Sequence, residues 1–115
     1  IPGPDSVTAA LSASGLPTDR YIFLGFLPKS EKRRDEMLSN HVNLGATVAI
    51  LESPNRLISL LESIRRVAGN RKVSVANDMT KLHESIVTGS IDRAIEAFKD
   101  KLKGEFVVLV SKEEL

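Results

Sequence analysis

The chain has 115 residues, which suffices for one domain with a single core but not for two domains of ordinary size. Apolar residues make up 42% and charged residues 27%, as in ordinary soluble globular proteins. The formal net charge of +1 excludes a strong long-range attraction toward nucleic acid, so any RNA contact must come from local clusters. With no Cys and two His, disulfides and thiolate metal sites are excluded, and no metal site is expected.

Turn-forming residues open the chain. Pro2, Gly3 and Pro4 combine fixed and permissive backbone angles, which is typical of turns and linkers. We therefore expect residues 1–4 to be the remnant of an interdomain linker. Residues 5–115 are then expected to form the C-terminal domain of a longer, two-domain protein.

The first half of the chain contains a predicted helix, strand and helix. Asp5 caps a helix that Gly15 ends. Residues 21–26 are rich in aromatic and branched side chains and predict a strand, whose aromatic rings are expected to fill the core. Ser30 begins a polar helix that reaches about His41.

The apolar run over residues 47–51 predicts a central strand that is covered on both faces. Ser53 and Pro54 follow it as a cap and a first-turn proline. The apolar residues beyond them recur at helical spacing until Gly69.

Residues 72–76 and 84–88 predict two strands, and their short connection makes an antiparallel pair the expectation. Ser90 caps a last helix, residues 105–110 form a final buried strand, and residues 112–115 are expected to be a polar end. Alternating strands and helices predict a single α/β domain with a mixed sheet of about five strands, flanked by helices.

Two polar segments, over residues 52–56 and 77–84, follow predicted strands. In open α/β sheets, ligands bind beyond the carboxyl ends of strands. Either segment could therefore line a ligand site, or could simply begin a helix and form a solvated turn.

Basic residues gather around the start of the second predicted helix. Lys29, Lys32, Arg33 and Arg34 alternate with acidic residues, which is typical of a solvated helix face but is also compatible with RNA contact. No phosphate-binding loop, nucleophile elbow or HExxH motif is present.

Several segments, read in order, resemble one family. The segments are Pro2-Gly3-Pro4, Gly25-Phe26-Leu27-Pro28-Lys29, Glu52-Ser53-Pro54-Asn55-Arg56-Leu57, Thr80-Lys81-Leu82-His83-Glu84 and Gly104-Glu105-Phe106-Val107. Together they look like the C-terminal half of the bacterial ribosomal RNA small-subunit methyltransferase I family, within the tetrapyrrole methylase superfamily. The resemblance covers nearly the whole chain.

The resemblance implies an S-adenosylmethionine-dependent enzyme that 2′-O-methylates a cytidine of small-subunit ribosomal RNA. It implies a cytoplasmic homodimer in which an N-terminal methylase domain completes the cofactor cleft, so that this chain alone is inactive. The implied cofactor contacts are Pro2, Gly3, Pro4, Leu51, Glu52, Asp78, Met79 and Thr80. Lys81 and Glu84 are the implied catalytic candidates, and Lys29, Lys32, Arg33, Arg34 and Arg56 the RNA-binding ones.

The chain departs from the family pattern at three places. Asn55 stands where the family usually has His, Asn77-Asp78 where it has Arg-Glu, and Asp5 where a small residue is usual. The second change removes a bidentate donor for carboxylate or phosphate. Two alternatives therefore stay open: a methyltransferase acting on a tetrapyrrole, and a non-catalytic α/β module for dimerisation or RNA docking.

Overall fold

The computed structural model describes residues 4–78, 85–101 and 103–115, apart from the side chains of Pro4, Asp5 and Asp78. Within these residues, five strands form one sheet in the order β1-β2-β5-β3-β4. β1 and β2 pair in parallel, and the other three pairings are antiparallel, which confirms the predicted mixed sheet. The strands are β1 (Tyr21–Phe26), β2 (Thr47–Glu52), β3 (Arg71–Asp78), β4 (Ser85–Gly89) and β5 (Glu105–Glu114).

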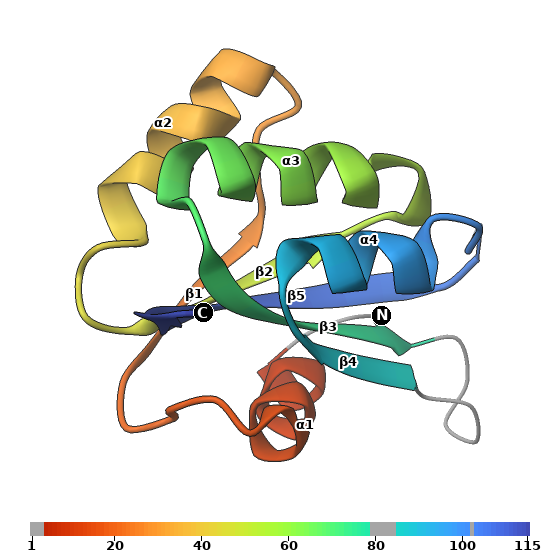
Figure 1. Ribbon diagram of the computed structural model, residues 1–115, viewed down its shortest axis with the longest axis horizontal. Coiled ribbons are helices and arrows are strands. Elements are labelled where there is room, and N and C mark those ends of the chain that lie inside the picture. The colour runs from red at the N-terminus through yellow and green to blue at the C-terminus, as the bar shows by residue number, and fades with distance from the viewer. Residues whose placement is uncertain (1–3, 79–84, 102) are drawn as a thin grey trace.

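Helices cover both faces of the sheet (Figure 1). The helices α2 (Glu31–His41), α3 (Leu57–Ala68) and α4 (Ile91–Phe98) lie on one face, and α1 (Pro4–Ser14) lies on the other. The larger core cluster joins the apolar face of α3 to alternate residues of β2, β3 and β5. A smaller cluster lies under α1 and contains Ala49, Leu51, Val107 and Leu109.

Local signals set most helix ends. The Ser30 hydroxyl accepts a hydrogen bond from the amide of Arg33 at the start of α2, and Ser90 does the same for Arg93 at the start of α4. These bonds satisfy amides that the first helical turn leaves without partners. Gly69 follows α3 with a φ of 73°, which a residue without a Cβ adopts at little cost.

Several predicted boundaries differ from the structure. α1 already begins at Pro4, so Asp5 lies within the helix and not at its cap position. Ser53 precedes a short 3-10 turn, η1 (Pro54–Arg56), and its hydroxyl donates to Asn55 instead of capping an amide. β5 continues to Glu114, where residues 112–115 were expected to be a polar end. The extension pairs Glu114 with Arg71, which gives these polar residues a strand partner that their composition did not indicate.

The aromatic residues of β1 do not fill the core, contrary to the expectation from sequence. Tyr21, Phe23 and Phe26 are 49%, 44% and 54% exposed. β1 is one of the two edge strands of the sheet, so no further strand of the described chain lies beside its outer edge. The core ring pair is instead Phe98 and Phe106, in edge-to-face contact with centroids 5.2 Å apart.

Candidate ligand-facing edge of the sheet

The carboxyl ends of β2 and β3 lie at the same edge of the sheet, with only β5 between them. Glu52, the last residue of β2, is the register partner of Phe106, and Asn77 near the end of β3 is the partner of the same residue. The two polar segments predicted from sequence therefore start side by side. This edge is where open α/β sheets place their ligands.

Glu52 is a buried carboxylate, with 1% of its surface exposed. One carboxylate oxygen, Oε1, accepts from the amide of Ser53 at 2.9 Å and lies 3.8 Å from Nη1 of Arg56. The other oxygen, Oε2, has no hydrogen-bond partner among the described residues. A buried carboxylate oxygen without a partner is costly, so Oε2 marks a position that suits a donor or a cation.

Asn77 is equally buried, but its side chain has a hydrogen-bond partner. Its Nδ2 donates to the carbonyl of Lys103 at 3.2 Å, which ties the end of β3 to the segment that enters β5. Sequence reasoning missed this role, because the contact joins residues 26 positions apart. Asn77 thus stabilises the shape of the edge, where the family resemblance would place an arginine.

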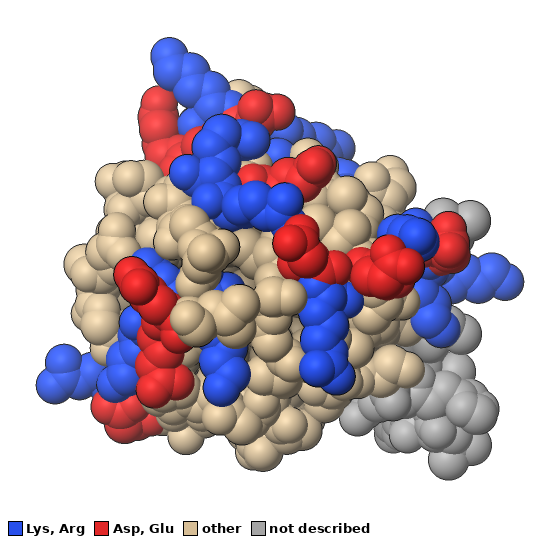
Figure 2. All heavy atoms as spheres, in the orientation of Figure 1, with Lys and Arg blue, Asp and Glu red and all other residues tan. Residues whose placement is uncertain are grey.

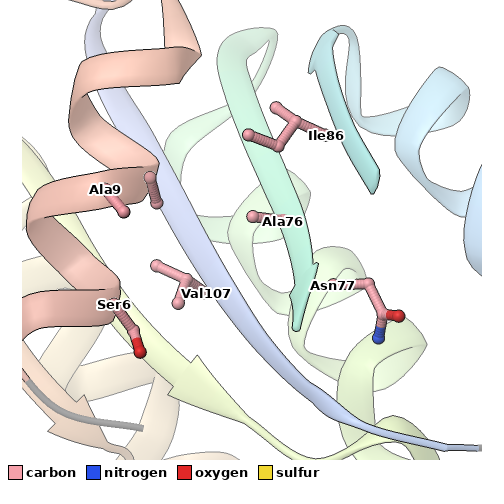
Figure 3. A pocket seen from close by; sticks show the side chains of 7 residues that line it. Ser6, Ala9, Ala76, Asn77, Ile86 and Val107 are labelled. Carbon is pink, nitrogen blue, oxygen red and sulfur yellow. The ribbon is translucent and has the colours of Figure 1, made fainter. Parts of the chain in front are cut away.

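A small cleft of about 30 Å³ opens between α1 and the sheet near this edge. Figure 3 shows Ser6 and Ala9 of α1 opposite Ala76 and Val107, while the carboxamide of Asn77 turns away from α1. The cleft is mostly apolar and has room for about one water molecule. The described residues on this side of the sheet therefore do not enclose a cofactor by themselves.

The predicted cofactor contacts differ in where they lie. Glu52 lies at the edge, as the last residue of β2. Leu51 is 3% exposed and packs in the cluster under α1, so that only its main chain is near the edge. Pro4 begins α1 and Asp78 ends β3, with the main chain of Asp78 paired to Glu105. Pro2, Gly3, Met79 and Thr80, together with the catalytic candidates Lys81 and Glu84, lie outside the described residues.

Arg34 does not belong to an exposed RNA-binding cluster, and the prediction is wrong on this point. Its side chain is buried, and its Nε donates to Ser63 at 3.0 Å. Its Nη2 donates to both the hydroxyl and the carbonyl of Ser59, at 2.8 and 3.3 Å. The guanidinium therefore joins α2 to α3, and the exposed basic residues here are Lys29, Lys32 and Arg33.

Arg56 also has partners within the chain. Its Nη2 donates to the carbonyl of Pro28 at 3.4 Å, and its Nη1 faces Glu52. It thereby connects the segment after β1 to the segment after β2. About a quarter of its side chain stays exposed, so an RNA contact through Arg56 remains a prediction.

Charges of both signs alternate over α2, α3 and α4 (Figure 2). Arg66 of α3 contacts Asp35 of α2 at 2.8 Å and Glu31 at 3.4 Å. Desolvation acts to raise the pKa of Asp35, but hydrogen bonds from Arg66 and Ser63 outweigh it, so the pKa lies below its ordinary value. Ion pairs between helices thus cross this part of the surface.

The fold and this edge define an α/β domain whose ligand-facing side lies at the carboxyl ends of β2 and β3. The sequence pattern of the family described as Tetrapyrrole (Corrin/Porphyrin) Methylases matches residues 1–95. The chain belongs to this family. No helix within the described residues is both long and apolar enough to cross a membrane.

Curated relatives carry one shared name. A protein of Rickettsia prowazekii named "Ribosomal RNA small subunit methyltransferase I" is 42% identical over 112 residues, which are 96% of this chain and 40% of the relative. A protein of the same name from Thermotoga maritima is 39% identical over 115 residues, which are 99% of this chain and 51% of the relative. The chain thus spans about half the length of the curated relatives it matches.

Solved structures show the same fold at low sequence identity. A cobalt precorrin-4 methyltransferase is 18% identical with a TM-score of 0.67, and the match covers 96% of this chain and 50% of that one. A uroporphyrin-III C-methyl transferase from Thermus thermophilus, complexed with S-adenyl homocysteine, is 15% identical with a TM-score of 0.56 over 95% of this chain and 50% of that one. These similarities confirm the predicted tetrapyrrole-methylase type of fold.

Proposed function

We propose that the full-length protein transfers the methyl group of S-adenosylmethionine to the 2′-hydroxyl of a cytidine in small-subunit ribosomal RNA. The observation that carries this proposal is the identity of 42% and 39%, over almost the whole chain, to relatives named "Ribosomal RNA small subunit methyltransferase I". We further propose that the chain pairs with an N-terminal methylase domain in a cytoplasmic homodimer. In this arrangement the chain supplies one wall of the cofactor cleft and part of the RNA surface.

The edge residues fit such a cofactor. S-adenosylmethionine carries a sulfonium and an ammonium group, and both are attracted to a carboxylate. Glu52 offers one: its Oε1 is held by Ser53, while its Oε2 has no partner among the described residues. Glu52 is therefore the proposed cofactor residue with the clearest physical support. Pro2, Gly3, Pro4, Leu51, Asp78, Met79 and Thr80 are proposed on the family resemblance.

The cofactor supplies an activated methyl group when bound. A ribose 2′-hydroxyl is weakly acidic, so the protein must align its oxygen with that methyl group, and alignment can provide much of the rate. A side chain that accepts the hydroxyl proton adds a further contribution. We propose Lys81 or Glu84 for this supporting role, since they are the ionisable residues of the most specific family motif.

A methyl-transfer assay tests the proposal. The full-length protein is incubated with labelled S-adenosylmethionine and either small ribosomal subunits or a tetrapyrrole, and the products are hydrolysed to locate the label. We expect label in 2′-O-methylcytidine and none in the tetrapyrrole, and we expect the 115-residue chain to transfer none. Label in the tetrapyrrole alone would favour the tetrapyrrole methyltransferase. The absence of both transfer and cofactor binding would favour a non-catalytic docking module.

A further inference from the structure

The exposed aromatic residues of the described chain are concentrated in one strand. The sequence contains four Phe, one Tyr and no Trp. Phe98 and Phe106 pair in the core, whereas Tyr21, Phe23 and Phe26 all belong to β1 and are about half exposed. Burying aromatic rings is among the most favourable uses of apolar surface, so three exposed rings on one strand call for a functional reason.

A bulge places the three rings on one face of the sheet. Tyr21 and Phe23 are partners of Thr47 and Ala49, on the face that carries α1. The register then shifts between Phe23 and Gly25, and Phe26 becomes the partner of Leu51, on the same face. Gly25 has a φ of 69° at this bulge, a conformation that favours glycine. In a regular strand, Phe26 would point to the opposite face, because it lies three residues after Phe23.

No helix of the described chain covers this part of the face. α1 lies on this face but contacts β3, β4 and β5, toward the end of the strand order away from β1 (Figure 1). Among the strands that the structure describes, none pairs with the outer edge of β1. The aromatic residues therefore line an open surface, hereafter the β1 surface: Tyr21, Phe23 and Phe26.

Cations without partners stand at both ends of the β1 surface in sequence. Arg20 precedes β1 and Lys29 follows it, and both are exposed. Lys32 and Arg33 are also exposed, at the start of α2, which lies on the opposite face of the sheet. None of these four forms an ion pair within the described part of the chain, as is also true of Lys72, Arg93, Lys101 and Lys103. The free positive charge near β1 complements a polyanion.

We propose that the β1 surface stacks unpaired bases of the RNA substrate, with the flanking cations near its phosphates. The inference rests on the proposed function, because RNA is the substrate there. Tyr21 and Phe23 are two residues apart, about 6.6 Å along the strand, so each can present a ring to a separate base. Base–aromatic stacking and a basic flank are the usual means of holding single strands. A protein partner is less favoured, because lysine is depleted at the cores of protein interfaces.

To distinguish stacking from ordinary apolar contact, we compare variants that keep apolar area but lose the ring with variants that keep the ring. In the full-length protein, Phe23→Leu and Phe26→Leu are compared with Phe23→Tyr and Phe26→Tyr. The probe is a single-stranded RNA oligonucleotide containing 2-aminopurine, whose fluorescence is quenched on stacking. We expect each Leu variant to bind about 5- to 100-fold more weakly with less quenching, and each Tyr variant to bind like the wild type. Leu115→Ala, an exposed residue at the far end of the chain, is the control and leaves binding unchanged.

The outcomes distinguish this inference from the proposed function. Leu variants that bind and quench like the wild type overturn the β1 surface as a stacking site, even if the wild type methylates ribosomal RNA. Sedimentation shows whether the Leu variants change the oligomeric state. If they do, while RNA affinity is unchanged, the β1 surface contacts a second copy of the chain, and the stacking proposal is overturned. If RNA binding depends on the rings but the wild type transfers no methyl group, the β1 surface is supported as a stacking site and the proposed function is contradicted.

Discussion

Arg34 of α2 donates from its Nε to the hydroxyl of Ser63 in α3, at 3.0 Å, inside a junction that leaves Arg34 only 3% exposed. Ser59, one turn earlier in α3, accepts from the same guanidinium. A cation in this position is held by neutral oxygens of a neighbouring helix. Its contribution is to the packing of α2 on α3, so it is unavailable to a phosphate.

Replacing Arg34 therefore lowers stability more than replacing its exposed neighbour. Hydrogen bonds to charged groups contribute about 1.5–3 kcal/mol, and we expect Arg34→Ala to reduce the free energy of unfolding by about 2–3 kcal/mol. Arg33→Ala, one position earlier and exposed, should stay within about 0.5 kcal/mol of the wild type. Urea denaturation measures both. Equal losses for the two variants would contradict the assignment of Arg34 to the helix junction.

The ion pair between Asp35 and Arg66 predicts a dependence of stability on acid pH. The pKa of Asp35 is lower in the folded than in the unfolded protein, because hydrogen bonds from Arg66 and Ser63 outweigh desolvation. Its contribution is thus fully present above the unfolded pKa of about 3.9 and is lost as the pH falls through the folded pKa. Asp35→Asn should flatten the fall in stability below about pH 4, as followed by thermal unfolding across pH. Glu36→Gln, an exposed neighbour, should leave the profile unchanged.

Glu52 provides a test of the cofactor-facing edge. In the full-length protein, Glu52→Gln removes the charge that Oε2 offers, and we expect the affinity for S-adenosylmethionine to fall about tenfold or more. The free energy of unfolding should stay the same or rise, because an incompletely paired buried charge is costly. Calorimetry and urea denaturation measure the two quantities. Glu113→Gln, exposed near the end of β5, is the matched control. Unchanged affinity for the cofactor would remove Glu52 from the proposed site.

Gly25 sets the bulge that places Phe26 on the face of Tyr21 and Phe23. A residue with a Cβ in the left-handed region costs about 1–2 kcal/mol, so Gly25→Ala should lower the free energy of unfolding by about that amount. Gly69→Ala, at a φ of 73° and with open space around the added atom, should cost a similar amount. Only Gly25→Ala should also weaken RNA binding, as measured by fluorescence anisotropy. If both variants bind RNA equally well, the bulge has no part in RNA contact.

Features that depend on neighbouring residues could be predicted from the sequence. Ser30 and Ser90 accept hydrogen bonds from amides three residues further along the chain, and the apolar run over residues 47–51 is typical of a central strand buried on both faces. The shared edge of β2 and β3 followed from the same local reasoning, since a strand, a crossover helix and a second strand return the chain in parallel. The register partners of Phe106 agree with this expectation.

Features that depend on the order of strands or on distant partners could not be predicted from the sequence. The burial of Arg34 requires α3 to lie 25–29 residues away in sequence and against α2 in space. The exposure of Tyr21, Phe23 and Phe26 follows from β1 being outermost, which aromatic composition does not reveal. Likewise, Asn77 finds its partner at Lys103, a contact that no motif signals.

Hydrogen exchange of the full-length protein, with and without S-adenosylmethionine, tests most directly whether the carboxyl ends of β2 and β3 form a wall of the cofactor site. We expect slower exchange of main-chain amides in η1 and in the last residues of β3 when the cofactor is added, with α2 unchanged. Protection confined to other parts of the protein, with no change at Ser53 to Leu57 or at Asn77, would contradict it.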